Sequence, residues 1–320
     1  MTTAAALSPL VENDPASAMI ELTNKCQLTC ITCPRDKTFA EDYEIGVMQL
    51  EHFQRVFDQF KGSINTLDLT GLGESLMHPQ IFEIIRYVRQ ESKVHIYLTS
   101  NTLLLTEKYL AGLKQDPVDT LCISIDGVTS EQFSLVRGRM DYGKLKERVK
   151  AARQSLSPRT EFILCVVLVE ENYRDMPRFV ELAKELGIGR LSLKPINLVG
   201  NSIPSSYYQR FRTEEFEQLA DQSRVLGKEF GIHVDVFEIG RYSCSFPWDP
   251  IYVTWDGFVV PCCAKPFPKH VNFGNLLKES WAEIRNKPPF VQFRKQLLSD
   301  APPKFCNKCH IMEKTLFREA

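Results

Sequence analysis

The chain has 320 residues, with 39 lysines and arginines against 40 aspartates and glutamates, so its formal net charge is only −1. This balance gives no reason to expect a polyanionic partner such as nucleic acid. The N-terminus lacks a basic start followed by an apolar core, and no stretch approaches about 18 uninterrupted apolar residues. We therefore expect no signal peptide, no membrane span and a cytoplasmic location, where the ten cysteines are metal ligands or buried thiols rather than disulfides.

The first 235 residues alternate short apolar runs with amphipathic stretches. A polar stretch at 1–17 is expected to form a loose arm, and strands are predicted at 18–22, 66–70, 94–99, 120–125, 162–169 and 190–194. Helices are predicted at 48–60, 79–91, 106–115, 143–154, 175–187 and 213–231. This α/β alternation indicates a parallel sheet, and six strand–helix units fit a partial (β/α)6 barrel of the TIM type. The alternative is a doubly wound open sheet, but no G-x-G-x-x-G follows the first strand.

The texture changes after residue 235, where prolines, aromatics and cysteines become dense. The segment YVTWDGFVVPCC predicts a hairpin that turns at Asp256 and Gly257, and 276–286 predicts a helix. We therefore predict three parts: an arm at 1–17, a barrel at 18–235 and a small metal-stapled domain at 236–320.

Three cysteines follow the first predicted strand in a C-x3-C-x2-C pattern: Cys26, Cys30 and Cys33. Three thiolates suit a soft metal centre, whereas structural zinc would need a fourth ligand, and the nearest other cysteine is Cys122. A four-iron cluster held by three thiolates leaves one iron open. The motif resembles that of the radical S-adenosylmethionine (SAM) enzymes, in which SAM chelates this iron, and that family shares the partial-barrel fold.

The resemblance implies SAM contacts at the ends of the following strands. The sequence Gly71-Leu72-Gly73-Glu74 resembles the family's Gly-Gly-Glu motif, in which the glutamate holds the amino group of SAM. The other interpretation of this stretch is a turn with a solvated glutamate.

Further SAM contacts are implied at later strands. Ser100 and Asn101 belong to a stretch similar to the family's Thr-Asn-Gly, although the glycine is missing. Ser124 matches a residue that hydrogen-bonds the ribose, and Asp126 follows it at a spacing of two. Arg137 and Asn172 match residues near SAM or the substrate, although Arg137 also fits a surface position. Lys194, an isolated charge in an apolar strand, is expected either to face the cavity or to pair on the surface.

The C-terminal part carries a second set of cysteines. Cys244, twelve residues, Gly257, four residues and Cys262 resemble the opening of the SPASM and twitch domains of radical SAM enzymes, and Cys306 and Cys309 form a C-x2-C pair. No cysteine follows, which points to the shorter twitch version with one auxiliary [4Fe–4S] cluster. The implied ligands are Cys244, Cys262, Cys306 and Cys309, which leaves Cys263 over. A structural zinc site is the alternative.

The resemblance implies a radical SAM enzyme with two [4Fe–4S] clusters and SAM, reduced by a flavodoxin or ferredoxin. Cleaved SAM supplies a 5′-deoxyadenosyl radical that abstracts a substrate hydrogen. The preferred reaction is two-electron oxidation of a small natural-product-type molecule, as in twitch dehydrogenases of aminocyclitol biosynthesis, with Lys194 or Asp126 as the base and the auxiliary cluster as electron acceptor.

Three other functions stay open. A radical epimerase would return hydrogen from a thiol, for which Cys263, Cys122 and Cys165 are candidates. A peptide-modifying enzyme would act on a precursor peptide, although only about 17 residues precede the first strand, too few for a leader-binding domain. An electron carrier would keep the clusters without making a radical, and the intact open-iron motif with Glu74 argues against it.

Overall fold

The computed structural model describes residues 7–35, 44–138 and 140–319. Within them, ten strands form one sheet in the order β10-β9-β8-β1-β2-β3-β4-β5-β6-β7. Strands β1 to β7 run parallel, β8 is parallel to β1, and β9 and β10 are antiparallel. Their bounds are β1 Ser17–Ile20, β2 Thr66–Asp68, β3 His95–Ser100, β4 Thr120–Ser124, β5 Glu161–Leu168, β6 Arg190–Pro195, β7 His233–Val236, β8 Ile251–Val253, β9 Phe258–Val260 and β10 Gly274–Asn275.

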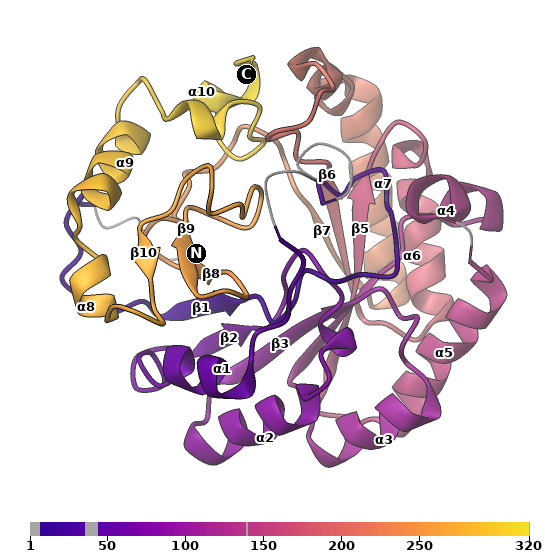
Figure 1. Ribbon diagram of the computed structural model, residues 1–320. Helices are drawn as coiled ribbons and strands as arrows, with labels where there is room; N and C mark the ends of the chain where they lie inside the picture. Colours follow the sequence, from indigo (N-terminus) through magenta and orange to yellow (C-terminus); the bar gives the residue numbers. More distant parts are fainter. Residues whose placement is uncertain (1–6, 36–43, 139, 320) are drawn as a thin grey trace.

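The helices cover the outer face of this curved sheet (Figure 1). All six helices predicted in the barrel are present: α1 Leu50–Phe57, α2 Ile81–Glu91, α3 Glu107–Gln115, α5 Tyr142–Ser155, α6 Met176–Glu185 and α7 Glu214–Phe230. A seventh, α4 Ser130–Arg137, was not predicted, because it buries only Phe133 and Val136 and so has little amphipathic pattern. Thr129 nevertheless caps α4 by accepting a hydrogen bond from the Gln132 N–H.

The predicted partial barrel is confirmed, with one strand more than expected. The helix α7 leads into β7, which pairs with β6 and forms one end of the sheet. The sequence of β7, HVDV, is short and half polar, so its pattern does not differ from that of a loop. Helices on the outer face alone, rather than on both faces, also exclude the doubly wound alternative.

The inner face of the barrel is polar because the strands alternate. On β6, Leu191 and Leu193 are buried against the helices, whereas Ser192 and Lys194 point the other way. They line a cavity of about 470 Å³ together with polar residues of the neighbouring strands, among them Tyr97. Several of its other lining residues, such as Thr66, His95 and Thr120, begin their strands, so this cavity extends toward the end of the barrel away from the loop after β1.

The C-terminal part continues the barrel's sheet. The hairpin predicted at Asp256 and Gly257 is confirmed: β8 and β9 are antiparallel, and Gly257 has a φ of +86°, which favours glycine. Because β8 also pairs with β1, the hairpin extends the sheet from its first strand. The C-terminal part also holds α8 Trp281–Ile284, α9 Pro288–Leu298, α10 Glu313–Leu316 and the 3-10 turn η4 Lys304–Cys306. Three further 3-10 turns lie in barrel loops: η1 Ser75–Met77, η2 Tyr173–Asp175 and η3 Ser205–Arg212.

Two expectations, about the C-terminal helix and the N-terminal arm, need correction. The helix predicted at 276–286 is only the four-residue α8, which starts at a Ser280 capping box, and α9 was not predicted. The described part of the arm, 7–16, is docked rather than loose, because Ser8 accepts a hydrogen bond from the Trp248 indole and Val11 bonds the Asn286 amide. The residues 1–6 lie outside the described ranges.

Two cysteines of the barrel differ from the expected free thiols. Cys122 on β4 and Cys165 on β5 are joined as a disulfide, with 6.1 Å between their Cα atoms. Neither is then available as a hydrogen donor. In the described ranges, no helix has the length and apolar character that crossing a membrane requires.

Candidate active site

The first cysteine motif occupies the loop after β1. Cys26, Cys30 and Cys33 are not joined in disulfides, and the Cys33 N–H donates to the Cys30 carbonyl at 3.1 Å. Another backbone bond, from the Ile31 N–H to Val136 of α4, fixes the loop against the barrel. Burial raises the pKa of the Cys30 thiol to about 11, opposed by the positive charge of Arg137. The thiols of Cys33 and Cys26 also act on this pKa, so the structure brings all three cysteines together.

The surroundings of Cys26 suit a thiolate. Its sulfur accepts hydrogen bonds from the Leu28 N–H at 3.4 Å and from the Asn101 amide at 3.5 Å. Donors aimed at sulfur stabilise negative charge on cluster ligands. In the described ranges, no three Cys, His, Asp or Glu side chains are close enough to hold a metal ion as they stand. The donor chemistry fits an iron–sulfur cluster, and the ligand assignment remains a proposal.

The Gly71-to-Glu74 loop packs directly onto the cysteine loop. A Cβ atom on Gly73 would lie 2.4 Å from the backbone oxygens of both Thr23 and Lys25. One on Gly71 would lie 2.3 Å from the Glu21 side chain. Without side chains, the two glycines let this loop pack closely against Glu21 and the segment that leads into Cys26.

Glu74 is buried where this loop meets the end of β3. Its carboxylate accepts hydrogen bonds from the Asn101 N–H at 2.7 Å and the Leu76 N–H at 3.3 Å. Burial raises its pKa to about 7, and the bonds from Asn101, Leu76 and Ser100 oppose the shift. Because Asn101 also bonds Cys26, the predicted residues Glu74, Ser100 and Asn101 form one group beside the cysteine loop. The interpretation as a solvated turn is wrong.

Thr102, the residue after Asn101, takes the backbone conformation expected of the glycine that this motif lacks here. Thr102 has a φ of +71°, in the left-handed region that glycine adopts without strain and β-branched residues rarely enter. Its side chain is fully buried, and its hydroxyl donates to the Asn101 carbonyl. The backbone shape expected of Asn-Gly is therefore kept at a cost in strain.

Asp126 and Asn172 are buried after the ends of β4 and β5, where they meet the half-buried Arg137 of α4. Asp126 is completely buried and accepts hydrogen bonds from Arg137 Nε and the Val167 N–H, both at 2.7 Å. The Asn172 amide donates to the carbonyls of Asp126 and Val167 and accepts from the Val169 N–H. These contacts engage the side chains that we had expected to act as a base (Asp126) and to touch SAM (Asn172). The roles predicted for both residues remain predictions, and Asp126 holds Arg137 toward Cys30.

Ser124 ends β4 and is mostly buried beside Cys165, its partner in register on β5. Its predicted contact with the SAM ribose remains a prediction.

Lys194 and Cys263 come together inside the barrel. The pKa of the Cys263 thiol is raised to about 11 by burial, with Asp68 raising it further and Lys194 lowering it. Its side chain is nevertheless solvent-accessible, as is part of Lys194. Asp68, at the end of β2, has its pKa raised to about 6 by burial, and both its bonds to Thr70 and the charge of Lys194 oppose the shift. These three side chains, from the elements β2, β6 and the segment after β9, therefore lie within one another's electrostatic reach.

Sequence reasoning missed Asp68 and Glu21. Asp68 belongs to the alternating stretch 66–70, so its spacing already placed it on the polar face with Thr66 and Thr70. Glu21 is a single carboxylate in an apolar strand, between Ile20 and Leu22, and is 1% exposed. An isolated charge in such a run signals either a partner or a site, and Glu21 carries this signal as clearly as Lys194 does.

The C-terminal cysteines gather from three segments. Burial raises the pKa of the Cys309 thiol to about 12, and the nearby thiols of Cys244 and Cys263 contribute to this increase. Burial raises the pKa of the Cys306 thiol, and the nearby thiols of Cys309 and Cys244 raise it further. Burial also raises the pKa of the Cys262 thiol, and Cys309 and Cys306 add to this increase. Four thiols close together, one buried and three half-buried, suit a metal centre, because coordination removes the proton and neutralises the charge. The donor set fits an auxiliary iron–sulfur cluster, again as a proposal.

The C-x2-C turn is braced against the barrel. Lys308 has a φ of +60°, its Nζ donates to the carbonyls of Asn201 and Ile203, and its own carbonyl accepts from the Tyr208 hydroxyl at 2.7 Å. Cys309 also receives a hydrogen bond from the Asn197 side chain.

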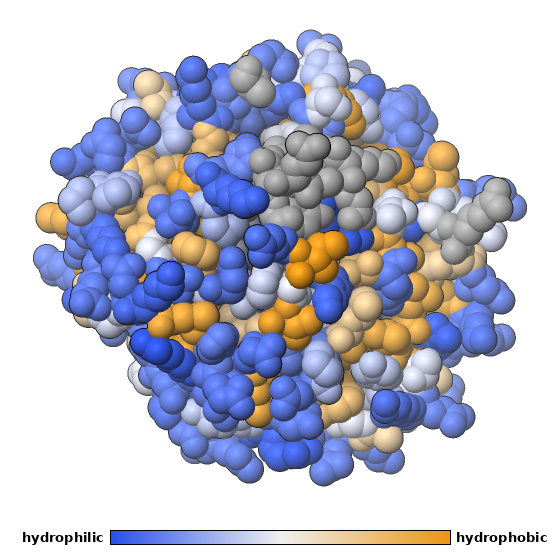
Figure 2. All heavy atoms as spheres, in the orientation of Figure 1, coloured by the Kyte–Doolittle hydropathy of each residue, from blue (hydrophilic) through white to orange (hydrophobic). Residues whose placement is uncertain are grey.

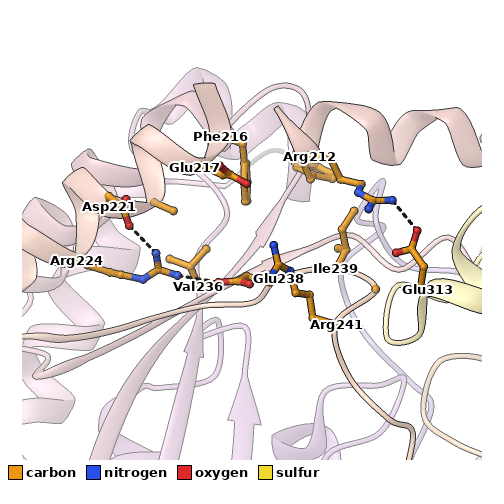
Figure 3. Close-up of a pocket in the computed structure, with 13 residues that line it drawn as sticks. Arg212, Phe216, Glu217, Asp221, Arg224, Val236, Glu238, Ile239, Arg241 and Glu313 are labelled. Atoms are coloured by element: carbon orange, nitrogen blue, oxygen red, sulfur yellow. Dashed lines mark hydrogen bonds and ion pairs between the residues drawn. The ribbon is translucent and has the colours of Figure 1, made fainter. Parts of the chain in front are cut away.

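A separate pocket of about 550 Å³ lies at the outer edge of the sheet, between α7 and the segment after β7 (Figure 3). Its charges are largely paired: Arg224 bonds Asp221 at 2.8 Å, and Arg212 bonds Glu313 at 2.8 Å. It contains none of the predicted site residues. The face of the molecule seen in Figure 2 is mostly hydrophilic, with hydrophobic atoms in scattered groups.

Comparison with known families decides what this geometry belongs to. The sequence profile of the radical SAM superfamily matches residues 20–183, and that of the SPASM iron–sulfur cluster-binding domain matches residues 244–310. The chain belongs to the radical SAM superfamily. Membership implies a [4Fe–4S] cluster and SAM, and the SPASM domain implies auxiliary iron–sulfur binding. The bounds proposed for the two domains, 18–235 and 236–320, remain a prediction.

Curated relatives match most of this radical SAM chain. It is 26% identical over 302 residues to the antilisterial bacteriocin subtilosin biosynthesis protein AlbA of Bacillus subtilis, covering 92% of this chain and 64% of that protein's length. It is 25% identical over 312 residues to the PqqA peptide cyclase of Gluconobacter oxydans, covering 94% and 84%. The crystal structure of Streptococcus suis SuiB bound to precursor peptide SuiA shares the fold, with a TM-score of 0.73 at 13% identity over 96% of this chain and 75% of that one.

Proposed function

We propose that this radical SAM enzyme removes a hydrogen atom from a carbon of a peptide substrate. The names of two relatives, a bacteriocin biosynthesis protein and a peptide cyclase, support a peptide rather than the small molecule that we had preferred. The observation that carries the proposal is the meeting of Asp68, Lys194 and Cys263 inside the barrel, since they join strand ends of the radical SAM domain to the SPASM domain.

The residues that hold the cofactors follow from the two groups of cysteines. Cys26, Cys30 and Cys33 would hold the first cluster, and Cys244, Cys262, Cys306 and Cys309 the auxiliary one. When bound, these clusters and SAM supply the substrate-activating radical and an electron acceptor. A flavodoxin or ferredoxin is the proposed reductant.

Glu74 is proposed to accept hydrogen bonds from the amino group of SAM. With a pKa of about 7, its carboxyl is only partly ionised at neutral pH. An ammonium group nearby would favour the charged form and so strengthen the contact. The residues Gly71, Gly73, Ser100 and Asn101 shape this position, and Arg137, held by Asp126, faces the cysteine loop.

Where Asp68, Lys194 and Cys263 meet, Asp68 is proposed to take the proton that an oxidised substrate loses. Its pKa of about 6 lies close to neutral pH, where a general base works well. Lys194 supplies positive charge beside it and orients the substrate. This assigns to Asp68 the base role that we had given to Lys194 or Asp126.

Epimerisation is the second candidate, and Cys263 is the observation that favours it. A hydrogen donor must be accessible and carry its proton, and Cys263 is exposed while its neighbour Cys262 lies among the other thiols. Cys263 instead faces the charges of Asp68 and Lys194.

The test is anaerobic reconstitution with iron, sulfide, SAM and dithionite in heavy water. A pool of synthetic peptides and a pool of aminocyclitols are supplied separately, and 5′-deoxyadenosine and product masses are measured. We expect 5′-deoxyadenosine above the substrate-free rate with peptides only, and a product lighter by two hydrogens. Turnover of aminocyclitols alone would refute the peptide proposal. A peptide product that gains deuterium without losing hydrogens, and that disappears in Cys263→Ala, would establish the epimerase instead.

The SAM assignment is tested by Glu74→Gln, with the exposed helix residue Glu83→Gln as the matched control. Loss of a charge-assisted hydrogen bond should weaken SAM binding by about 1.5–3 kcal/mol, at least tenfold, without lowering iron content. Calorimetry on the reconstituted variants measures this. Equal affinity in both variants would show that the loop does not bind SAM.

A further inference from the structure

Glu21 lies where the SPASM hairpin meets the Gly71-to-Glu74 loop. It directly follows β1, and its N–H bonds the Val253 carbonyl of β8 at 2.9 Å, which continues the β1–β8 pairing (Figure 1). The residue is 1% exposed. One oxygen, Oε2, accepts from the Leu72 N–H at 2.8 Å and from the Tyr252 hydroxyl at 3.0 Å. The other, Oε1, accepts from the Trp255 N–H at 3.5 Å.

These three donors come from two different parts of the chain. Leu72 belongs to the loop that ends in Glu74, whereas Tyr252 and Trp255 belong to the β8–β9 hairpin of the SPASM domain. The side chain also fills the space above Gly71, where a Cβ atom would lie 2.3 Å from its Cγ. A buried carboxylate that accepts hydrogen bonds from two segments holds both of them in place. Releasing either segment would leave a buried polar group without its hydrogen bond, which costs free energy.

The hydrogen-bond partners of Glu21 connect it to both parts of the candidate active site, the cysteine loop around Cys26 and the group around Cys263. On the loop side, the Glu74 N–H bonds the Lys25 carbonyl, and the Glu74 carboxylate bonds Asn101, which bonds Cys26. On the hairpin side, Tyr252 is fully buried and lies within the electrostatic reach of Cys263 and Asp68.

The hairpin makes a second contact with the first half of the site. The indole ring of Trp255 covers Gly46, where a Cβ atom would lie 2.2 Å from it. Gly46 in turn is bonded by Thr23 and Asn24, directly before the cysteine loop. Glu21 is therefore one part of a continuous contact between the hairpin and the loops around Cys26.

We propose that Glu21 is a positioning residue that holds the SAM-binding loop in register with the SPASM hairpin, so that changes in the hairpin alter SAM binding. This rests on the proposed assignment of Glu74 to SAM. It assigns no chemical step to Glu21, which acts through Leu72 on one side and Tyr252 on the other.

The decisive variant is Tyr252→Phe, because it lies in the other domain and removes one hydroxyl. Its matched control is Tyr173→Phe, which removes the hydroxyl of another buried tyrosine, one that bonds Glu215 of α7 and not this loop. We expect Tyr252→Phe to weaken SAM binding about two- to tenfold, the range for one hydrogen bond, and Tyr173→Phe to leave it unchanged. Glu21→Gln should weaken it further, since an amide N–H would oppose one of the donors.

Calorimetry with SAM on reconstituted protein is combined with iron content and the thermal midpoint without SAM. A merely structural role would lower the midpoint in both tyrosine variants and leave SAM affinity of the folded protein unchanged. Wild-type affinity in Tyr252→Phe and Glu21→Gln, together with weakened binding in Glu74→Gln, would overturn the role of Glu21 alone. Wild-type affinity in Glu74→Gln as well would overturn the SAM assignment and this proposal with it.

Discussion

Replacing Gly73 by alanine tests the contact on which the candidate active site depends. The added Cβ atom would lie 2.4 Å from the carbonyl oxygens of Thr23 and Lys25, about one ångström short of ordinary van der Waals contact at 3.4 Å. Both neighbours are backbone atoms of the segment that leads into Cys26, so no flexible side chain can move away. Overpacking costs about 1–3 kcal/mol, and we expect the upper end, about 3 kcal/mol, because two backbone segments must separate.

Denaturant unfolding of Gly73→Ala and of Gly189→Ala measures this cost. Gly189 has nothing within 4 Å of a Cβ atom and no positive φ, so alanine there should be neutral or stabilise by about 0.4–1 kcal/mol through the unfolded state. The same shift of the loops should weaken SAM binding, which calorimetry on reconstituted protein detects. If Gly73→Ala unfolds at the same denaturant concentration as Gly189→Ala, the close packing of the two loops is refuted.

Three further outcomes follow from the structure. The pKa of Asp68 is raised from 3.8 to about 6, so the folded chain binds this proton more tightly than the unfolded chain does. The free energy of unfolding, measured relative to Asp68→Asn, should therefore fall by up to about 3 kcal/mol as the pH rises from about 4 to about 6. A difference that does not change with pH would contradict this. Thr102→Gly should change stability by less than about 1 kcal/mol despite losing a buried side chain, because relief of its left-handed strain of about 1–2 kcal/mol offsets the loss; a large destabilisation on denaturant unfolding would argue against strain. Reconstituted protein should hold about eight irons per chain, and replacing Cys26, Cys30 and Cys33 together by alanine should leave about four by iron assay, whereas zinc in the wild type would refute the auxiliary cluster.

The sequence by itself determined the elements that depend on local pattern. Alternating apolar runs and helical periodicity predicted six strands and six helices of the barrel, and Asp256-Gly257 predicted the hairpin turn, because these features depend on neighbouring residues. The cysteine spacing and the Gly71-to-Glu74 motif also indicated the family, which the profile matches confirmed. Short or weakly patterned elements such as β7 and α4 escaped, since their stability comes from their neighbours.

Only the tertiary structure decided which side chains meet and which are already engaged. Asp68, Lys194 and Cys263 are far apart in the chain, and they approach one another because parallel strands bring their ends to one edge and β8 adds the SPASM hairpin to β1. Asn172 matches a SAM-contacting position in sequence, yet its amide is taken up by three backbone groups. A sequence pattern specifies which groups a residue offers, whereas the partners that satisfy a buried polar group come from segments that only folding brings together.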